Sequence, residues 1–319
     1  MSGSTSAHDD EIDLDDALTV VMARVRPHIG EGRVADYIPE LGRVDPARFG
    51  FAVATVDGRV HTVGDTDLRF SMQSITKVFT LALVTQKGDT RKGDTHIWER
   101  VHREPSGSAF NSLYQLEFEN GIPRNPFINP GAIVVTDELL AETGDAFATL
   151  RELLRAETGN PDLDTDGVTA HSEQATGERN RALAHLMAGF GNMRNPVPET
   201  LDHYFRQCSI TITATELARA GLLLARHGVR ADGSRMLDRG AARRILAIML
   251  TCGTYDAAGE FAYRVGLPCK SGVGGGILAV VPGRYSIAAW GPGLDAKGNS
   301  VTGALALDTF TQATNCSVF

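Results

Sequence analysis

The chain has 319 residues, which is enough for a large buried core. Hydrophobic residues make up 42% and charged residues 22%, a composition typical of globular proteins that excludes the disordered and fibrous classes. Its 39 acidic against 31 basic residues give a net charge of -8, which argues against binding to nucleic-acid phosphates. Because no apolar stretch reaches the roughly 18 residues of a membrane span and no secretory signal is recognisable, we expect a cytoplasmic protein with no membrane partner.

The N-terminal part predicts a tail, a helix and a hairpin. Residues 1–11 are small, polar or acidic, so we expect a disordered acidic tail. Apolar residues then recur at helical spacing over 14–25, with Asp13 as a cap and Pro27 near the end. Residues 51–56 and 60–63 have strand character, and Asp57-Gly58 predicts a two-residue turn between them.

The middle of the chain is predicted to be helical and its end to return to strands. Helical patterns cover 75–84, 136–156, 178–190, 213–227 and 241–250. Strand patterns follow at 261–265, 276–281 and 285–290, with a turn at Pro282-Gly283 and a last helix near 302–314. The tandem KGDT at 87–90 and 92–95 predicts a surface loop.

This order predicts an α/β (α+β) fold in which an antiparallel sheet, flanked by the terminal helices, carries an inserted helical lobe. We expect a single catalytic unit over 12–319, after the tail. Its sheet lobe would comprise about 12–72 plus 255–319, and its helical lobe about 73–254. A site built by both lobes would lie at their seam.

Ser74-Ile75-Thr76-Lys77 is an S-x-x-K element placed where strand gives way to helix. One helical turn brings the lysine amine beside the serine hydroxyl, which pairs a nucleophile with a base. The plain alternative is a helix-capping serine and a solvated lysine. The apolar neighbours Val78 and Phe79 favour the catalytic interpretation, because apolar surroundings drive a lysine toward its neutral form.

A second element, Lys270-Ser271-Gly272, precedes a glycine run and an apolar strand, and is close to the K-T-G motif that accompanies S-x-x-K in serine β-lactamases and penicillin-binding proteins. A phosphate-binding loop is disfavoured, because Cys269 stands where that motif needs glycine and a strand follows. The third motif of that class, S-x-N or Y-x-N, is missing. The pattern therefore indicates the same fold with a different chemistry.

Taken together, nine motifs over about 34–303 resemble those of the serine-dependent glutaminases. They are DYIPEL (36–41), FSMQSITKV (70–78), EPSG (104–107), NPFINPGAIV (125–134), SEQATGERN (172–180), LDHYFRQCSI (201–210), TCGTYD (251–256), LPCKSGVGGGI (267–277) and GNSVTG (298–303). The resemblance implies a β-lactamase-like fold that hydrolyses L-glutamine to L-glutamate and ammonia. It also implies no metal or organic cofactor, and a homodimer or homotetramer.

The resemblance assigns roles to residues. Ser74 matches the nucleophile and Lys77 its general base, and Tyr37 and Tyr255 match tyrosines that flank the nucleophile. The positions that match substrate-binding residues are Gln73, Ser74, Asn129, Glu173, Asn180, Tyr204, Tyr255 and Val273, the last through its backbone N–H as an oxyanion donor beside that of Ser74. Pro130, where the family often has alanine, and the KGDT insertion depart from the family pattern.

Two alternatives share these motifs: a penicillin-recognising serine hydrolase or transpeptidase, and a non-catalytic amino-acid sensor. The first predicts the missing asparagine motif and usually export. The histidines show no paired ligand spacing and the four cysteines no CxxC, so neither a metal site nor a disulfide is expected.

Overall fold

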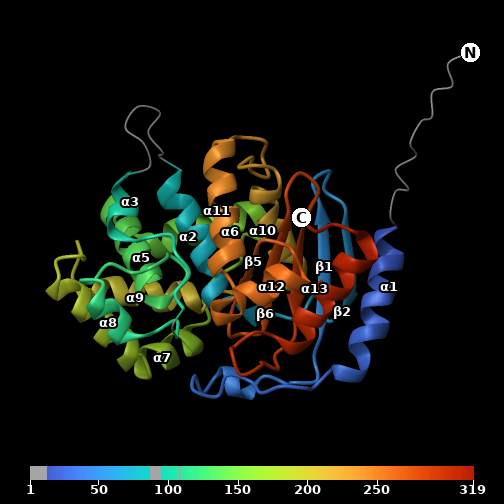
Figure 1. The fold of residues 1–319 in the computed structure, drawn as a ribbon, viewed down its shortest axis with the longest axis horizontal. Coiled ribbons are helices and arrows are strands. Elements are labelled where there is room, and N and C mark those ends of the chain that lie inside the picture. Colours follow the sequence, from blue (N-terminus) through green and yellow to red (C-terminus); the bar gives the residue numbers. More distant parts are fainter. Residues whose placement is uncertain (1–12, 87–94, 108) are drawn as a thin grey trace, which may run out of the picture.

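The computed structural model describes residues 13–86, 95–107 and 109–319. The predicted acidic tail and nearly all of the KGDT repeat lie outside these residues. Figure 1 shows two lobes, a sheet lobe that contains the first and last helices and a lobe of helices built by the middle of the chain. In the described part of the chain, every helix is too short or too polar to cross a lipid bilayer.

The predicted order of elements is largely present. The helices are α1 (Leu14–Val25), α2 (Thr76–Thr85), α3 (Thr95–Arg100), α4 (Leu113–Phe118), α5 (Asn129–Thr143), α6 (Ala146–Thr158), α7 (Gly167–Ala175), α8 (Glu178–Gly189), α9 (Val197–Cys208), α10 (Ala214–Ala225), α11 (Arg239–Cys252), α12 (Ala258–Arg264) and α13 (Val301–Thr314). The strands are β1 (Gly50–Thr55), β2 (Val60–Gly64), β3 (Phe70–Ser71), β4 (Thr211–Ile212), β5 (Cys269–Ser271), β6 (Gly276–Val281) and β7 (Tyr285–Trp290).

The main sheet has the order β2-β1-β7-β6-β5 with antiparallel neighbours throughout, which confirms the predicted fold class. Its central strands β1, β6 and β7 are buried along their whole length. Since successive side chains of a strand point to opposite faces, both faces of the sheet must be covered. Phe51 and Val53 join the core beneath the terminal helices α1 and α13, whereas Ala52 and Ala54 join the larger core shared with α10 and the helical lobe. The small alanines let α10 lie close to the sheet.

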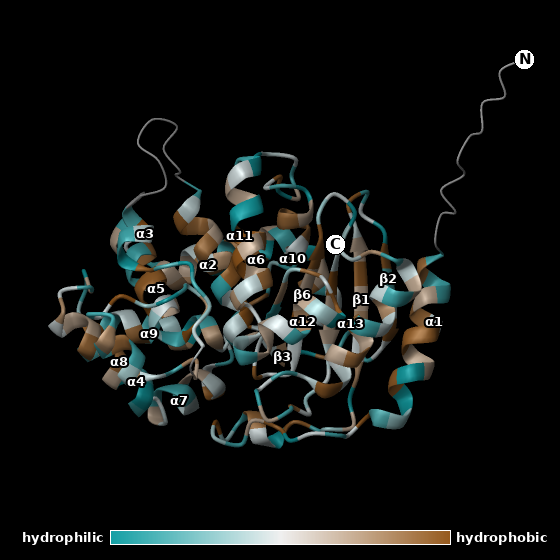
Figure 2. Ribbon diagram, viewed as in Figure 1, coloured by the Kyte–Doolittle hydropathy of each residue, from teal (hydrophilic) through white to brown (hydrophobic). Residues whose placement is uncertain are grey.

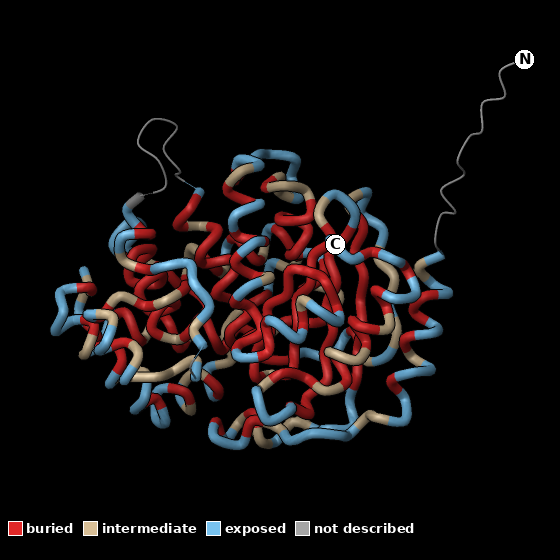
Figure 3. The backbone as a smooth tube through the Cα atoms, viewed as in Figure 1, coloured by how far each residue is buried: buried red, intermediate tan, exposed pale blue. Residues whose placement is uncertain are grey.

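Helices α2, α5 and α9 form the centre of the helical lobe, and the other helices of the lobe surround them (Figure 1). Figure 2 shows hydrophobic residues concentrated in the strands and these inner helices. Figure 3 shows that the same segments are buried, while the outer turns of the peripheral helices are exposed. Each lobe therefore has its own buried interior.

The strand predicted at 261–265 is wrong: these residues lie in α12 and its C-cap. The sequence FAYRV alternates apolar and polar residues, but Phe261 and Val265 are also one helical turn apart, and both are buried in the core beneath α13. Tyr263, between them, is 88% exposed. A five-residue pattern with apolar residues at its two ends fits both the two-residue period of a strand and the 3.6-residue period of a helix. Here the burial of Phe261 together with Val265 favours the helix.

The single helix predicted over 136–156 is also wrong, because α5 and α6 are separate. Gly144 ends α5 with a left-handed φ of 75°, and the Asp145 side chain then caps α6 by accepting from the Ala148 N–H.

The hairpin between β1 and β2 is present, but its turn is longer than the two residues predicted, since the Thr55 N–H donates to Arg59 O.

A buried ionic network fixes helix α5. Asp137 is completely buried and accepts hydrogen bonds from Arg100 Nη2 at 2.6 Å and from the backbone N–H groups of Arg194 and Asn195, each at 2.9 Å. Burial alone would raise the pKa of Asp137, but these donors hold it below its ordinary value. The carboxylate thus ties α3, α5 and the segment before α9 together.

We expect Asp137→Asn to lower the free energy of unfolding by about 2 kcal/mol at neutral pH, because it removes one of the two carboxylates that pair with the Arg100 guanidinium and weakens the hydrogen bonds from the Arg194 and Asn195 N–H groups. Urea unfolding measures this change. The matched control is Glu260→Gln, which breaks an exposed i, i+4 pair with Arg264 and should cost at most about 0.5 kcal/mol. Equal effects of the two substitutions would show that the network does not hold α5.

Candidate functional site

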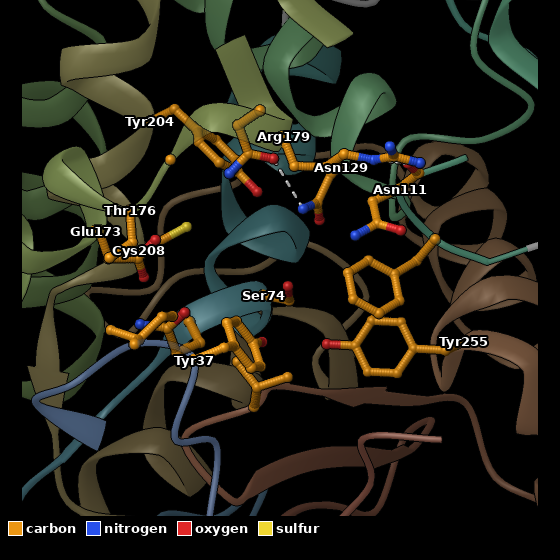
Figure 4. Close-up of a pocket in the computed structure, with 16 residues that line it drawn as sticks. Tyr37, Ser74, Asn111, Asn129, Glu173, Thr176, Arg179, Tyr204, Cys208 and Tyr255 are labelled. Carbon is orange, nitrogen blue, oxygen red and sulfur yellow. Dashed lines mark hydrogen bonds between the residues drawn. The ribbon is translucent and has the colours of Figure 1, made fainter. Parts of the chain in front are cut away.

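A cavity of about 230 Å³ opens where the two lobes meet. Nine of the ten predicted site residues line it, and the tenth, Lys77, lies behind Ser74. Figure 4 shows Ser74 at the centre of this cavity, Tyr255 on one side, and Glu173 with Cys208 on the other. The predicted site residues that line it are Tyr37, Gln73, Ser74, Asn129, Glu173, Asn180, Tyr204, Tyr255 and Val273.

Ser74 lies in a 3₁₀ turn, Gln73–Ile75, between β3 and α2. Gln73 adopts a left-handed φ of 50°, a strained conformation for a residue with a side chain, and this sharp turn brings the Ser74 hydroxyl to the cavity. Strand β3 pairs with β4, so the turn is anchored to the helical lobe. The nucleophile candidate therefore sits on well-fixed backbone.

The glycine run after β5 packs directly against this turn. A Cβ at Gly272 would lie 2.5 Å from Met72 O, and one at Gly274 would lie 2.1 Å from Ser71 O. Only glycine permits this approach, which places Val273 at the cavity wall. Among the described residues, the Val273 backbone N–H donates to no other backbone group, so it is available to a ligand oxygen.

Lys77 is almost completely buried, at 3% exposure, as its apolar neighbours predict. Desolvation lowers the pKa of its amine to about 8, although Glu173 acts in the opposite direction. Its Nζ donates to Asn129 Oδ1 at 2.8 Å and to Phe127 O at 3.2 Å. A large fraction of Lys77 is therefore neutral slightly above neutral pH.

The loop that holds Lys77 is itself fixed by local sequence. Asn125 Oδ1 accepts from the N–H groups of Phe127 and Ile128, each at 3.0 Å, and its Nδ2 donates to the backbone of the EPSG segment. A Cβ at Gly131 would lie 1.9 Å from Asn125 O, so this turn requires glycine. The motif NPFINPG thus positions the two acceptors of the lysine.

Glu173, on α7, is buried and its Oε1 has no hydrogen-bond partner among the described residues. Burial raises the pKa of Glu173 to about 7, while a hydrogen bond from Gln73 and the nearby Lys77 lower it. An unpaired carboxylate oxygen that is buried in a cavity wall is costly unless a ligand satisfies it. A cationic group of a ligand is the natural partner.

Tyr255 faces Ser74 from the sheet lobe, with a left-handed φ of 56°. Burial raises the pKa of its phenol to about 12, and a hydrogen bond with Ser74 partly offsets this rise. Its ring lies between Phe110, at 4.9 Å between centroids, and the Lys270 amine, at 4.5 Å from the ring centroid. These contacts hold the hydroxyl toward Ser74.

Lys270 is fully buried, and its Nζ donates to Gly253 O at 2.9 Å. Desolvation, followed by repulsion from Lys77, holds the pKa of Lys270 well below its ordinary value. It supplies a second amine near Lys77, but it lies against the face of the Tyr255 ring and does not line the cavity.

Sequence reasoning missed several cavity residues. Phe110 and Asn111 follow the EPSG motif, and Arg179 and Cys208 stand inside motifs that were recognised, but residue type alone gave them no role. Arg179 Nε donates to Asn111 O at 2.9 Å, which joins the loop before α4 to the start of α8. Burial raises the pKa of the Cys208 thiol, so this cysteine is unsuited to be a nucleophile.

Tyr37 stands at the mouth of the cavity and is 58% exposed, so it can contact a ligand without being fixed by packing. Tyr204 is buried at the back wall.

In the described part of the chain, no group of three or more His, Cys, Asp or Glu residues is arranged to hold a metal ion.

Comparison with known proteins places this site in context. The Glutaminase family model matches residues 32–319. A glutaminase of Streptomyces coelicolor is 63% identical over 290 residues, which are 91% of this chain and 93% of that protein. A glutaminase of Paraburkholderia phytofirmans is 52% identical over 303 residues, 95% of this chain and 98% of that protein.

Solved structures agree with these sequence matches. A probable glutaminase of Bacillus subtilis superposes with a TM-score of 0.85 at 32% identity, covering 96% of this chain and 98% of that one. The protein Mglu, solved in its glutamate form, superposes with a TM-score of 0.87 at 35% identity, covering 96% of this chain and 69% of that one.

Proposed function

Because this chain belongs to the glutaminase family and therefore hydrolyses L-glutamine to L-glutamate and ammonia, we propose that it does so through Ser74 as nucleophile and Lys77 as general base. The observation that carries this proposal is the cavity itself. It combines a positioned serine, a lysine behind it with a pKa of about 8, and a buried carboxylate of which one oxygen has no partner among the described residues. Family membership decides against the penicillin-recognising and sensor alternatives.

Acylation begins when neutral Lys77 takes the proton from Ser74 Oγ. The oxygen then forms a bond to the side-chain amide carbon of glutamine, and the carbonyl becomes an oxyanion. The backbone N–H groups of Ser74 and Val273 stabilise this charge, and the second is supported by its lack of a backbone acceptor.

Collapse of the intermediate breaks the carbon–nitrogen bond and releases ammonia, which receives the proton that Lys77 holds. Tyr255 relays that proton, because its hydroxyl faces Ser74 and a pKa of about 12 keeps it protonated. A water molecule then attacks the acyl-enzyme and its proton passes to Lys77. The ester bond to Ser74 breaks as Lys77 returns that proton to Ser74 Oγ, which gives glutamate and the free enzyme.

Polar residues of the helical lobe orient the substrate. The free carboxylate oxygen of Glu173 pairs with the α-ammonium of glutamine, and Asn129 and Asn180 donate to its α-carboxylate. Gln73 and Tyr204 complete the wall, and Tyr37 closes the mouth. This arrangement fixes the distance between the α-groups and the attacked carbon.

We also propose a cytoplasmic homo-oligomer, as the sequence resemblance implies. Tyr114 and Phe118 support association, because they lie one turn apart on α4 and are 81% and 77% exposed. Figure 2 shows α4 at the outer edge of the helical lobe. Light scattering of the purified chain measures the size of the assembly, and a monomer at all concentrations contradicts this part of the proposal.

Ser74→Ala should lower kcat by at least about 100-fold while leaving the fold intact, since it removes only the nucleophilic oxygen. A coupled assay for ammonia measures the rate, and circular dichroism checks the fold. A folded variant that retains more than about one hundredth of the wild-type kcat would rule out Ser74 as the nucleophile.

Glu173→Gln should raise KM for glutamine strongly, because it removes the charge that faces the α-ammonium. The thermal midpoint should change little or rise, since the buried carboxylate has an unsatisfied oxygen.

Asparagine should be a poor substrate of the wild-type enzyme, because its shorter arm cannot reach Ser74 while its α-groups stay bound. Comparable kcat/KM values for the two amides would contradict this substrate orientation.

The value of kcat/KM should rise with pH, because Lys77, with a pKa of about 8, and Glu173, with a pKa of about 7, must both lose a proton. Below both values the logarithm should climb with a slope approaching two, and it should level off above the higher one. In Glu173→Gln the slope should fall to one. A flat wild-type profile from about pH 5 to pH 9 would show that Lys77 is not the base.

A further inference from the structure

The side chain of Asn129 joins Lys77 to the part of the cavity that receives the substrate's α-carboxylate. Its Oδ1 accepts from Lys77 Nζ at 2.8 Å, and its Nδ2 donates to Asn180 Oδ1 at 3.0 Å. The dashed line in Figure 4 marks the second bond. One planar amide thus contacts the base with its oxygen and the substrate-binding wall with its nitrogen.

These two bonds determine how the Asn129 amide is turned. A lysine amine in either protonation state offers hydrogens, so the amide oxygen must face Lys77 and the NH₂ group must face Asn180. The second hydrogen of Asn129 Nδ2 and the NH₂ group of Asn180 remain as donors beside the cavity. A carboxylate that accepts from them strengthens the same orientation.

The two acceptors of Lys77 also determine where its lone pair points. A neutral amine has two hydrogens and one lone pair in a tetrahedral arrangement. Asn129 Oδ1 and Phe127 O take the two hydrogens. The lone pair is then left for a third direction, and Ser74 lies one helical turn earlier, next to the start of the same helix.

We propose that Asn129 is the positioning residue of the general base: its oxygen aims the lone pair of Lys77 at Ser74, and its nitrogen couples that alignment to binding of the substrate's α-carboxylate. The inference rests on the proposed role of Lys77 as base. It assigns to Asn129 a function beyond holding the substrate, because an asparagine that only bound the carboxylate would not influence the lysine.

Other charged or titratable groups also act on Lys77. Glu173 on α7 raises the pKa of its amine and Lys270 on β5 repels it, whereas the Cys208 thiol on α9 stays protonated, and therefore neutral, because burial raises its pKa. Glu173 and Lys270 act through space, each from its own element, whereas Asn129 makes a direct hydrogen bond. Substitutions at Asn129 are therefore expected to shift the titration of Lys77 without rearranging these three neighbours.

The test is a pH titration of Lys77 by NMR in protein labelled with ¹³C in its lysine side chains. The chain has only five lysines, Lys77, Lys87, Lys92, Lys270 and Lys297, and Lys77→Arg identifies the signal. Asn129→Asp should raise the Lys77 pKa by at least about one unit, because it places a carboxylate on the amine. Asn129→Ala should lower it, because the acceptor that favours the charged form is lost.

Asn111→Asp is the matched control, since it adds the same charge to the cavity wall at a residue that Figure 4 places away from Glu173 and outside the Asn129–Asn180 bond. It should shift the Lys77 titration by less than half of the Asn129→Asp shift. Asn180→Asp should raise KM much more than it moves Lys77. Circular dichroism checks each fold, and Asn129→Ser replaces any Asn129 variant that does not fold.

A kinetic comparison tests the coupling. L-Glutamine amide, whose α-carboxylate is replaced by a neutral amide, should lose kcat as well as affinity in the wild type, and this extra loss in kcat should vanish in Asn129→Ala. Lys77 titrations that stay within about 0.3 unit of wild type in the Asn129 variants would overturn the inference. In that case Lys77 still stands as the base if kcat/KM of the wild-type enzyme falls at low pH with the same midpoint as the Lys77 titration. A fall in kcat/KM with a different midpoint overturns both the role of Lys77 as base and the role of Asn129.

Discussion

The burial of the Lys77 amine is the constraint on which the site depends. A lysine in water keeps its proton far above neutral pH and cannot accept one from serine. Burial on α2 lowers its pKa to about 8, a value suited to a general base near neutrality. The surrounding core must exclude water to maintain that shift, so the proposed role of Lys77 depends on the apolar packing of the helical lobe.

The site requires both lobes. The sheet lobe contributes Tyr255, Lys270 and the glycine run, and the helical lobe contributes Glu173 and Asn129. The short β3–β4 pairing and the close approach of Gly272 and Gly274 to the carbonyls of Met72 and Ser71 join these parts at the serine. Because the two lobes meet at the backbone that carries Ser74, a small displacement of either would disturb the geometry of attack.

Local patterns in the sequence predict much of this fold. The spacing of apolar residues in α1, the strand character of 51–56 and the capping Asp13 are local signals, and the structure agrees with them. The pattern failed at 261–265, where a few residues fit both periods and the packing of Phe261 decided between them. It failed again at α5 and α6, where Gly144 is a stop signal inside an otherwise continuous helical pattern.

The site was predictable in part. The pairing of Ser74 with Lys77 follows from helical spacing, and the residues that we propose to bind the substrate follow from the family motifs. The bond from Lys77 to Asn129 joins residues 52 positions apart, so only the folded chain reveals it. The unpaired oxygen of Glu173 and the contact of Lys270 with the Tyr255 ring likewise depend on three-dimensional packing.

The most direct test of the central claim compares two titrations of the wild-type protein in the same buffer. One is the titration of the Lys77 side chain observed by NMR, and the other is the upper acidic limb of kcat/KM for glutamine. The account predicts that both have a midpoint near the Lys77 pKa of about 8. A Lys77 that stays protonated beyond about pH 10, as an exposed lysine does, while the activity is already maximal would contradict it.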